Sequence, residues 1–463
     1  MNTISRVDTN AKANTRGPPT SGWNYYKGLA KGFAKIVDSR ESTYRLALDL
    51  TAFDIPTLSA EAFRGIWRFL EAGWEAGIGT LMVFAAPKIT TWVADFVCKF
   101  ILPKEEQAHA KQYLRFHMSE LSSTKDMQKA VERIKDQEPK DQERIAKIYD
   151  ELGNKKQHDR YINSANKIRE FCNNFKPNEE IREKIYKLKK AVILGESLIE
   201  GGVWGGFGLS LRFFRKYILR QDRFTGTMGY LSDEQSKGLG EGGELTLTQK
   251  ILGGAVIFLS PLLNTILLNS TKDKKVVEKS KFLSTVDEHL DMTHGVFPKL
   301  GLLFTYTSVP KWMSLFITSQ GWYERLERIF KFLTIIPSWW LGHRVTNGII
   351  AKAFDKKLSE KYNIKSGILV EPEYLKPAKT EGLSFMDKLK YWCPEPARIH
   401  HVLDRVEGEK LSKEKKEELH KEAEHMHAIT LYTGFALHSF LVWCVTMLVN
   451  WTTKLRVKHD MGQ

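Results

Sequence analysis

Residues 251–269, ILGGAVIFLSPLLNTILLN, run for nineteen positions without a charged side chain. A second stretch, residues 428–451 (AITLYTGFALHSFLVWCVTMLVNW), has no Asp, Glu, Lys or Arg in twenty-four positions. A helix rises about 1.5 Å per residue and the hydrocarbon core of a bilayer is about 30 Å thick, so about 20 apolar residues cross it. Both stretches are therefore predicted to span a membrane.

The rest of the chain is much more polar than these two stretches. Among its 463 residues 27% are charged, and the mean hydropathy is -0.34. The charge is concentrated locally: residues 103–190 contain 21 Lys and Arg and 16 Asp and Glu. These features predict an all-α, polytopic membrane protein of five to seven spans with helical inserts that face water.

The net charge of +15 bears on the expected partners. Lys and Arg next to spans orient membrane proteins and attract anionic head groups. No basic run interleaved with aromatic residues is present, so nucleic acid is not an expected partner. We expect the lipid bilayer, with anionic lipids, and a protein partner at residues 103–190 as a further option.

The expected organisation follows the alternation of apolar and charged segments. Residues 63–102 form a first membrane region, which is either one span kinked at Pro87 or a re-entrant hairpin. The first twenty-two residues have no apolar core of the kind found in a cleavable signal peptide, so an integral membrane protein without such a peptide is expected. The other segments are 1–62, a flexible tail and amphipathic lead-in; 103–190, a charged helical insert; 191–351, the main membrane body, with spans near 191–211, 251–269, 300–318 and 329–350; 352–427, a second water-facing insert; 428–451, the last span; and 452–463, a basic tail.

Within the first insert, apolar residues recur at helical spacing, and Pro139 and Pro177–Asn178 are typical of helix starts. Ser412 is predicted to start a charged helix that leads into the last span. Four features, Tyr149, Leu152–Gly153, Ala165 and Pro177, fall at spacings that resemble a tetratricopeptide repeat over residues 146–177. That resemblance implies a helix-turn-helix unit that binds a peptide or protein; a generic helical hairpin is the alternative.

The sharpest candidates for function are acidic residues in apolar segments. Glu71-Ala-Gly-Trp-Glu75-Ala-Gly-Ile and Glu196-Ser-Leu-Ile-Glu200-Gly-Gly-Val share one pattern, and a spacing of four puts each pair on one helical face. A carboxylate in hydrocarbon costs about 2.5 kcal/mol or more, so such groups usually face a protein interior or a watery cavity. If the two segments are packed copies, the four carboxyls converge as a cation or proton pathway. Otherwise the pairs lie at the interface and the neighbouring glycines serve only close helix packing.

Two further polar residues accompany these acids. Arg344 is a candidate counter-charge for Glu200, or else it extends to the membrane interface. His438 lies in the middle of the last span, where it either belongs to the same pathway or makes one interhelical hydrogen bond.

Histidines offer a different chemistry. His420, Glu424 and His427 fall at positions i, i+4 and i+7 of a predicted helix, a spacing able to hold a divalent metal. Together with His400–His401 and His289-Leu-Asp-Met-Thr-His294, they invite comparison with membrane di-iron desaturases and hydroxylases: His289 to His294 resembles the first histidine box of that family, and the other histidines do not match its boxes. That resemblance implies a metal-dependent, lipid-modifying enzyme. Histidines on a solvated helix surface are the alternative.

No phosphate-binding loop, nucleophile elbow or H-E-x-x-H helix is present in the sequence. The cysteines 98, 172, 393 and 444 form no CxxC motif and no close pair. We therefore expect no enzyme and no cofactor, and a transport or channel-like role that uses intramembrane carboxylates. The alternatives are a non-catalytic membrane scaffold and the metal-dependent enzyme.

Overall fold

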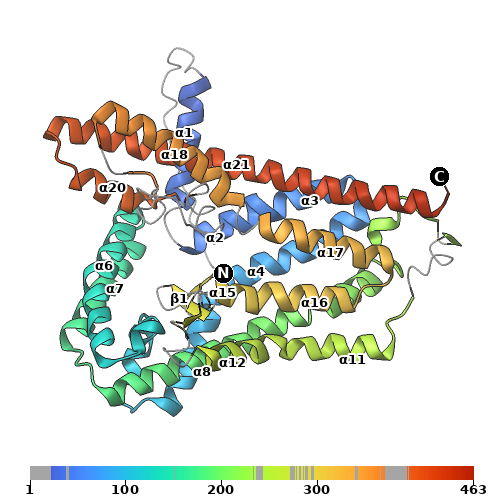
Figure 1. Cartoon of the computed structure of the whole chain (residues 1–463), viewed down its shortest axis with the longest axis horizontal. Coiled ribbons are helices and arrows are strands. Elements are labelled where there is room, and N and C mark those ends of the chain that lie inside the picture. The colour runs from blue at the N-terminus through green and yellow to red at the C-terminus, as the bar shows by residue number, and fades with distance from the viewer. Residues whose placement is uncertain are drawn as a thin grey trace, which may run out of the picture.

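The computed structural model describes residues 22–462 except 38–40, 152, 233, 236–242, 272–276, 278, 281–282, 285, 287–289, 294–296, 339–341, 365–366, 371–393 and 395. The described chain is an elongated bundle of helices (Figure 1), so the all-α prediction is confirmed. One antiparallel pair of two-residue strands, β1 (Met292–Thr293) and β2 (Phe297–Pro298), accompanies the helices.

The α-helices are α1 (Gly22–Val37), α2 (Glu41–Asp49), α3 (Ile55–Ala62), α4 (Ile66–Ile101), α5 (Ala110–Tyr113), α6 (Thr124–Glu151), α7 (Lys155–Asn174), α8 (Glu179–Gly205), α9 (Phe207–Phe213), α11 (Leu247–Ala255), α12 (Leu259–Ser270), α15 (Leu300–Leu303), α16 (Val309–Ile317), α17 (Trp322–Pro337), α18 (His343–Tyr362), α20 (Ile399–Gly408) and α21 (Lys413–Asp460). Single 3₁₀ turns lie at Gln107–His109, Ser119–Leu121, Thr225–Thr227 and Val256–Phe258, and π-helical turns lie at Leu50–Asp54, Phe214–Ile218 and Phe304–Ser308.

Three helices among the described residues are long and apolar enough to cross a membrane: α4, the continuous segment Leu247–Ser270 that contains α11 and α12, and α21. The other three predicted spans are interrupted. Residues 191–211 are divided between α8 and α9, and residues 300–318 pass through a π-helical turn. Residues 329–350 are divided between α17 and α18, with positions 339–341 outside the described chain. Five to seven spans are therefore not confirmed.

The first membrane region is one helix. α4 continues through Pro87 to Ile101, so the re-entrant alternative is not what the structure shows. Pro139 lies inside α6, and the prediction that it starts a helix is wrong. The starts at Asn178 and Ser412 are confirmed: the Asn178 side chain accepts a hydrogen bond from the Ile181 amide at 2.8 Å, and Ser412 is the N-cap of α21.

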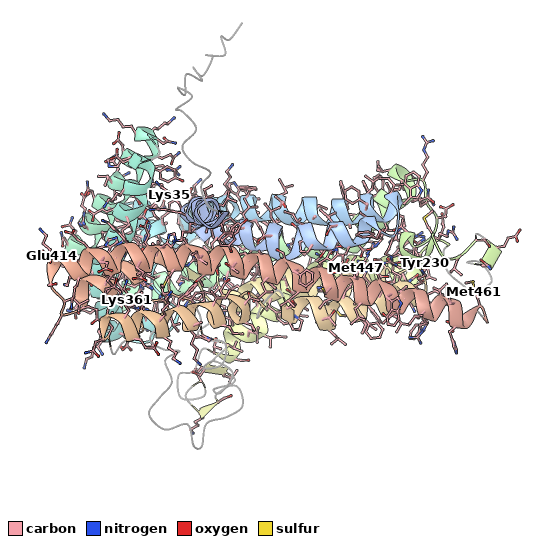
Figure 2. All side chains as sticks on the ribbon, turned by 90° about the horizontal axis from the view of Figure 1, so that it is seen from above. Lys35, Tyr230, Lys361, Glu414, Met447 and Met461 are labelled. Atoms are coloured by element: carbon pink, nitrogen blue, oxygen red, sulfur yellow. The ribbon has the colours of Figure 1, made fainter. Side chains whose placement is uncertain are left out.

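The bundle has two distinct ends, which Figure 2 marks by labelled residues. Glu414 and Lys361 lie at one, here called the insert end, and Tyr230 and Met461 lie at the other, the Tyr230 end. The α6–α7 hairpin and α20 are at the insert end, and both α1 and the hairpin run across the axis of the long helices (Figure 1). Segments predicted as two separate inserts therefore share one end of the molecule.

Glycines bring the central helices into backbone contact. A Cβ atom added at Gly205 of α8 would lie 2.6 Å from the carbonyl oxygen of Val256. One added at Gly201 would lie 2.2 Å from Cβ of Ser260. Such close approach is typical of helix pairs in membranes. It confirms the packing interpretation of the Gly-rich segment in α8.

Candidate functional site

A cluster of buried charges fills the interior toward the Tyr230 end. It is called the ion-pair network, and it contains six basic and five acidic side chains: Glu61, Arg64, Arg68, Glu71, Glu75, Arg215, Lys311, Glu324, Glu327, Arg328 and Lys331. The first five surround the turn between α3 and α4, where Gly65 takes a φ of +111°. This left-handed conformation favours glycine and lets α4 reverse against α3.

Glu71 lies at the centre of this network. Its Oε1 accepts hydrogen bonds from Arg215 at 2.7 Å, Arg68 at 2.9 Å and Arg328 at 3.4 Å. The hydroxyl of Thr225 donates to Oε2. Three basic side chains contact this one carboxylate and neutralise its charge. Their attraction offsets the free-energy cost of burying the carboxylate in the interior.

Glu75, one turn further along α4, is neutralised in the same way. Its carboxylate lies 2.8 Å from Nζ of Lys311 and 3.5 Å from Nη1 of Arg328. Glu327 of α17 is held by Arg64 at 2.8 Å and Lys331 at 2.7 Å. The ion-pair network thus ties α3, α4, α16 and α17 to the turn that follows α9.

One aromatic ring completes the cluster. The guanidinium groups of Arg64, Arg68 and Arg215 lie 5.7, 5.3 and 5.5 Å from the ring centre of Phe224. Cations over a ring face are attracted by its electron-rich centre. Phe224 is fully buried, so the turn at 224–227 closes the network toward the Tyr230 end.

Sequence reasoning missed most of this network, although a pattern for it exists. Residues 64, 68, 71 and 75 are two basic residues followed by two acidic ones at spacings of four, three and four, and residues 324, 327, 328 and 331 are two acidic residues followed by two basic ones. Each set lies on one helical face. Two such faces, each with two basic and two acidic residues, predict partners for each other, whereas the acids alone suggested a cation site.

The second acid pair has different surroundings. Glu196 and Glu200 on α8 are both buried. The hydroxyl of Tyr306 donates to Oε2 of Glu196 at 3.2 Å, and the side chain of Thr90 is a further hydrogen-bond partner. Within the described chain, no hydrogen bond reaches Oε1 of Glu196 and no basic nitrogen lies within 4 Å of its carboxylate. Thr90, Glu196, Glu200 and Tyr306 are called the Glu196 cluster.

Hydroxyl and amide groups lie next to this cluster on α12 and on the π-helical turn Phe304–Ser308. Thr305 donates to Oδ1 of Asn264 at 2.9 Å, and Asn264 donates to the Ser260 hydroxyl at 3.4 Å. All three are buried. Ser260 packs on Gly201, the residue that follows Glu200 in α8.

The convergence of all four glutamates is not observed. Two contacts show that α4 and α8 run antiparallel. Gly79 of α4 lies beside Trp204 of α8, whereas Thr90, further along α4, is hydrogen-bonded to Glu196, which comes earlier in α8. Equivalent positions of the repeated pattern therefore lie at opposite ends of the helix pair. The fifteen positions between Glu75 and Thr90 correspond to about 22 Å along a helix.

Two candidates for the proton or cation pathway remain, His438 and Arg344. Nε2 of His438 lies 2.9 Å from the Ser338 carbonyl oxygen, so this side chain makes an interhelical hydrogen bond. The side chain of Arg344 lies outside the described residues, and its pairing with Glu200 stays a prediction.

The described residues contain no group of three or more His, Cys, Asp and Glu side chains that could hold a metal ion. Of the predicted ligands, Glu424 lies 3.4 Å from Nζ of Lys31, and His427 is buried in the packing of α21. His289 and His294 lie outside the described chain. In the described part of the chain His420, Glu424 and His427 therefore do not form a metal-binding group.

A third buried polar group lies where α8 enters the insert. Asp291 is 2.5 Å from Nζ of Lys189 and 3.0 Å from Nδ1 of His117. Burial alone would raise the pKa of Asp291, but the charge of Lys189 and the hydrogen bond from His117 outweigh it and hold that pKa below its usual value. Asp291 thus joins the insert to α8 as an ionised group.

Comparison with known proteins adds no relative: no family model, no curated protein and no solved structure matches this chain.

Proposed function

We propose that this chain is an integral membrane protein of several spans that moves a proton or a cation through its bundle, with Glu196 and Glu200 as the binding carboxylates. One observation carries the proposal: Glu196 is fully buried against the candidate span α4, with hydroxyl partners but, in the described chain, no basic side chain against it. A lone carboxyl in such a place is stable only when it holds a proton or a cation.

The two acid pairs take different roles in this proposal. Glu71 and Glu75 already have basic partners, so they are unsuited to bind a further cation and instead hold α4 and α17 together. Glu196 keeps an oxygen without a hydrogen-bond partner in the described chain and lies beside the hydroxyl groups of Tyr306 and Thr90. Transport is thus assigned to the second pair alone.

The test is a flux measurement on purified protein reconstituted in liposomes. A trapped pH-sensitive dye reports proton entry after an external acid pulse, and labelled rubidium and sodium report cation entry. We expect entry above that of empty liposomes for the wild type and a loss of at least about tenfold for Glu196→Gln, with partial retention in Glu196→Asp.

The matched control is Glu183→Gln, which removes an exposed carboxylate from the first turns of the same helix. It should leave the flux unchanged. Wild-type flux equal to that of empty liposomes for all three ions, or an unimpaired Glu196→Gln variant, would remove the proposal. Extraction of cell membranes with alkaline carbonate tests the membrane location separately, because an integral protein stays in the pellet.

A further inference from the structure

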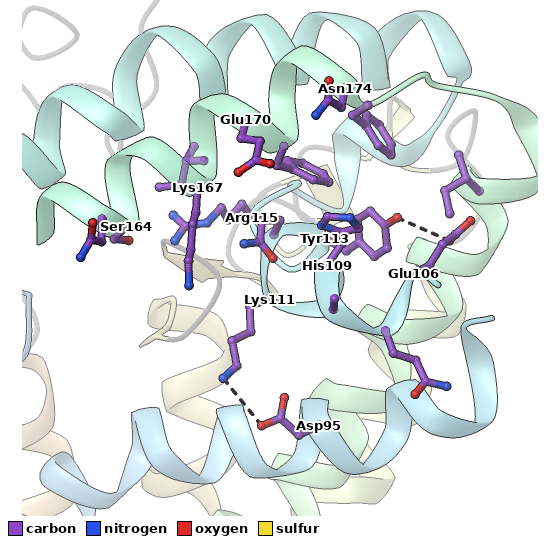
Figure 3. Close-up of a pocket in the computed structure, with 18 of the residues that line it drawn as sticks. Asp95, Glu106, His109, Lys111, Tyr113, Arg115, Ser164, Lys167, Glu170 and Asn174 are labelled. Atoms are coloured by element: carbon purple, nitrogen blue, oxygen red, sulfur yellow. Dashed lines mark hydrogen bonds and ion pairs between the residues drawn. The ribbon is translucent and has the colours of Figure 1, made fainter. Parts of the chain in front are cut away.

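A groove of about 1350 Å³ lies between α7, the residues around α5 and the C-terminal part of α4 (Figure 3). Asp95 of α4 forms one wall, so the groove is on the side of the α6–α7 hairpin that faces the bundle. Six basic side chains line it: Lys111, Arg115, Lys156, Arg160, Lys167 and Lys176.

Four acidic residues, Asp95, Glu106, Asp159 and Glu170, also line the groove, so the basic side chains exceed the acidic ones by two. Asp95 lies 3.7 Å from Nζ of Lys111, and Glu106 accepts a hydrogen bond from Tyr113 at 3.4 Å. Lys167 and Arg160 on α7 are exposed, and Figure 3 shows Lys167 and Lys111 extending into the space between α7 and α4. Arg115 forms an ion pair with Glu138 and Lys111 forms one with Asp95. The cations most accessible to a ligand are therefore the exposed Lys156, Arg160, Lys167 and Lys176.

The inner wall of the groove is aromatic. Phe171 packs against Tyr113 and His109, each with ring centres 5.6 Å apart, and against Phe175 at 5.0 Å. Tyr113 and Phe171 are buried by this packing, so the exposed His109 and the half-buried Phe175 are the rings that a ligand can contact beside the charges. An amphiphilic ligand suits this combination better than a small inorganic ion.

The outer face of α4 carries an exposed aromatic stripe in the same part of the helix as Asp95, which lines the groove. Trp92, Phe96 and Phe100 follow at intervals of one turn and are 62%, 53% and 75% exposed. Their rings pack on each other with centres 6.1 and 5.2 Å apart. α4 is a candidate span, and exposed aromatic residues near the end of a span are typical of the membrane interface.

The orientation of nearby helices agrees with this placement. The α6–α7 hairpin runs across the axis of the long helices, so it lies along the membrane surface when α4 crosses the bilayer (Figure 1). At the same end α1 also lies across that axis, with Lys27, Lys31 and Lys35 at intervals of four residues. The groove thus opens at the level of lipid head groups.

We propose that this groove binds an anionic phospholipid, with Lys111, Arg160 and Lys167 on the phosphate and the acyl chains along the aromatic stripe. Charge complementarity and continuity with the outer face of α4 favour a lipid over an acidic peptide, which would not need the stripe. The inference rests on the membrane location proposed above and is independent of ion transport.

The experiment is native mass spectrometry of the full chain in detergent, titrated with phosphatidylglycerol or phosphatidylcholine. The wild type should prefer phosphatidylglycerol. Changing Lys111, Arg160 and Lys167 together to Gln should weaken that binding by roughly 100-fold, since each cation near a lipid surface adds about a factor of five. The control triple, Lys125→Gln, Lys129→Gln and Lys135→Gln, removes three exposed cations of α6 outside the groove and should bind as the wild type does.

Further measurements distinguish a lipid from a soluble phosphate ester or an acidic peptide as the ligand of the groove. Phe96→Ala with Phe100→Ala should weaken binding of long-chain phosphatidylglycerol but not of its short-chain form, because the stripe holds the chains. Glycerol phosphate that binds as tightly as the lipid would overturn the proposal in favour of a soluble ester. An acidic peptide that displaces the lipid, or equal losses in both triples, would also overturn it. Circular dichroism confirms that each variant is folded, and recovery of the chain in the carbonate-soluble fraction would instead refute the membrane location.

Discussion

Arg215 and Glu71 face each other across the interior, with Nη2 of Arg215 2.7 Å from Oε1 of Glu71 and Nε 3.2 Å from Oε2. They lie 144 positions apart in the chain. Arg215 also reaches Glu324 at 2.8 Å, so one guanidinium joins α4, the end of α9 and α17. Removing one partner of such a group leaves a buried charge without compensation.

We therefore expect Glu71→Gln to lower the free energy of unfolding by about 3–5 kcal/mol. The double variant Glu71→Gln with Arg215→Gln should lose less than the sum of the two single variants, because the residues share one interaction. Denaturant titration in detergent measures both effects. Glu183→Gln, on the exposed face of α8, should change stability by no more than about 0.5 kcal/mol; strictly additive losses would contradict the pairing.

Gly205→Ala should destabilise the contact between α8 and the 3₁₀ turn Val256–Phe258. The added Cβ would meet the Val256 carbonyl oxygen at 2.6 Å and the backbone nitrogen of Ile257 at 2.8 Å, and backbone atoms cannot rotate away. We expect a loss of about 1–3 kcal/mol in the same titration. Gly254→Ala is the control in the adjoining helix, where nothing lies within 4 Å of the added atom. It should be neutral or stabilising by up to about 1 kcal/mol, and equal losses in the two variants would argue against the packing.

Acid should weaken the junction at Asp291. Its pKa is lower in the folded chain than the ordinary value of 3.8, so the unfolded chain binds the proton more tightly. The stabilisation is therefore fully present above about pH 4 and is lost as the pH falls toward the folded pKa. Unfolding titrations at several values from neutral pH downward should show a smaller acid-induced loss in Asp291→Asn than in the wild type.

The exposed pair of Asp136 and Lys140 supplies the comparison for this measurement. Asp136→Asn should keep the acid sensitivity of the wild type, because an exposed ion pair contributes little. An identical pH profile for wild type and Asp291→Asn would show that Asp291 does not carry the effect.

Both charged inserts should lie on the same side of the membrane. Arg144 of α6 forms an ion pair with Asp404 of α20, and both helices lie at the insert end. Single cysteines at Lys147 and Glu407, in a background without the four native cysteines, should react with an impermeant maleimide from one side of sealed vesicles. A cysteine at Ser232 should react from the other, and labelling of all three from one side would refute this topology.

Local patterns in the chain were sufficient for much of the fold. The apolar stretches at 251–269 and 428–451 predict long apolar helices, and these lie within Leu247–Ser270 and α21. Asn178 and Ser412 were predictable as helix starts, because a cap depends on neighbouring residues only. The prediction that Pro139 starts a helix was wrong. A proline within a helix loses one backbone hydrogen bond, and the packing of the buried face of α6 compensates for that loss.

The roles of the acids were not predictable from the same patterns. The two acid pairs, Glu71-x-x-x-Glu75 and Glu196-x-x-x-Glu200, have nearly the same sequence pattern. In the structure the first pair is surrounded by arginines and the second by hydroxyl groups. The antiparallel packing of α4 and α8 makes this difference. It carries the first pair toward Arg215 and α17 and leaves the second beside Tyr306.

The amino-acid sequence alone determined that the chain is helical, where its apolar segments lie and which residues face the same side of a helix, because these depend on spacing along the backbone. Only the tertiary structure decided which charges neutralise each other, that both inserts meet at one end, and that a basic groove lies beside an aromatic stripe. Those relationships join residues far apart in the chain, and the energy of a charge depends on what surrounds it in space.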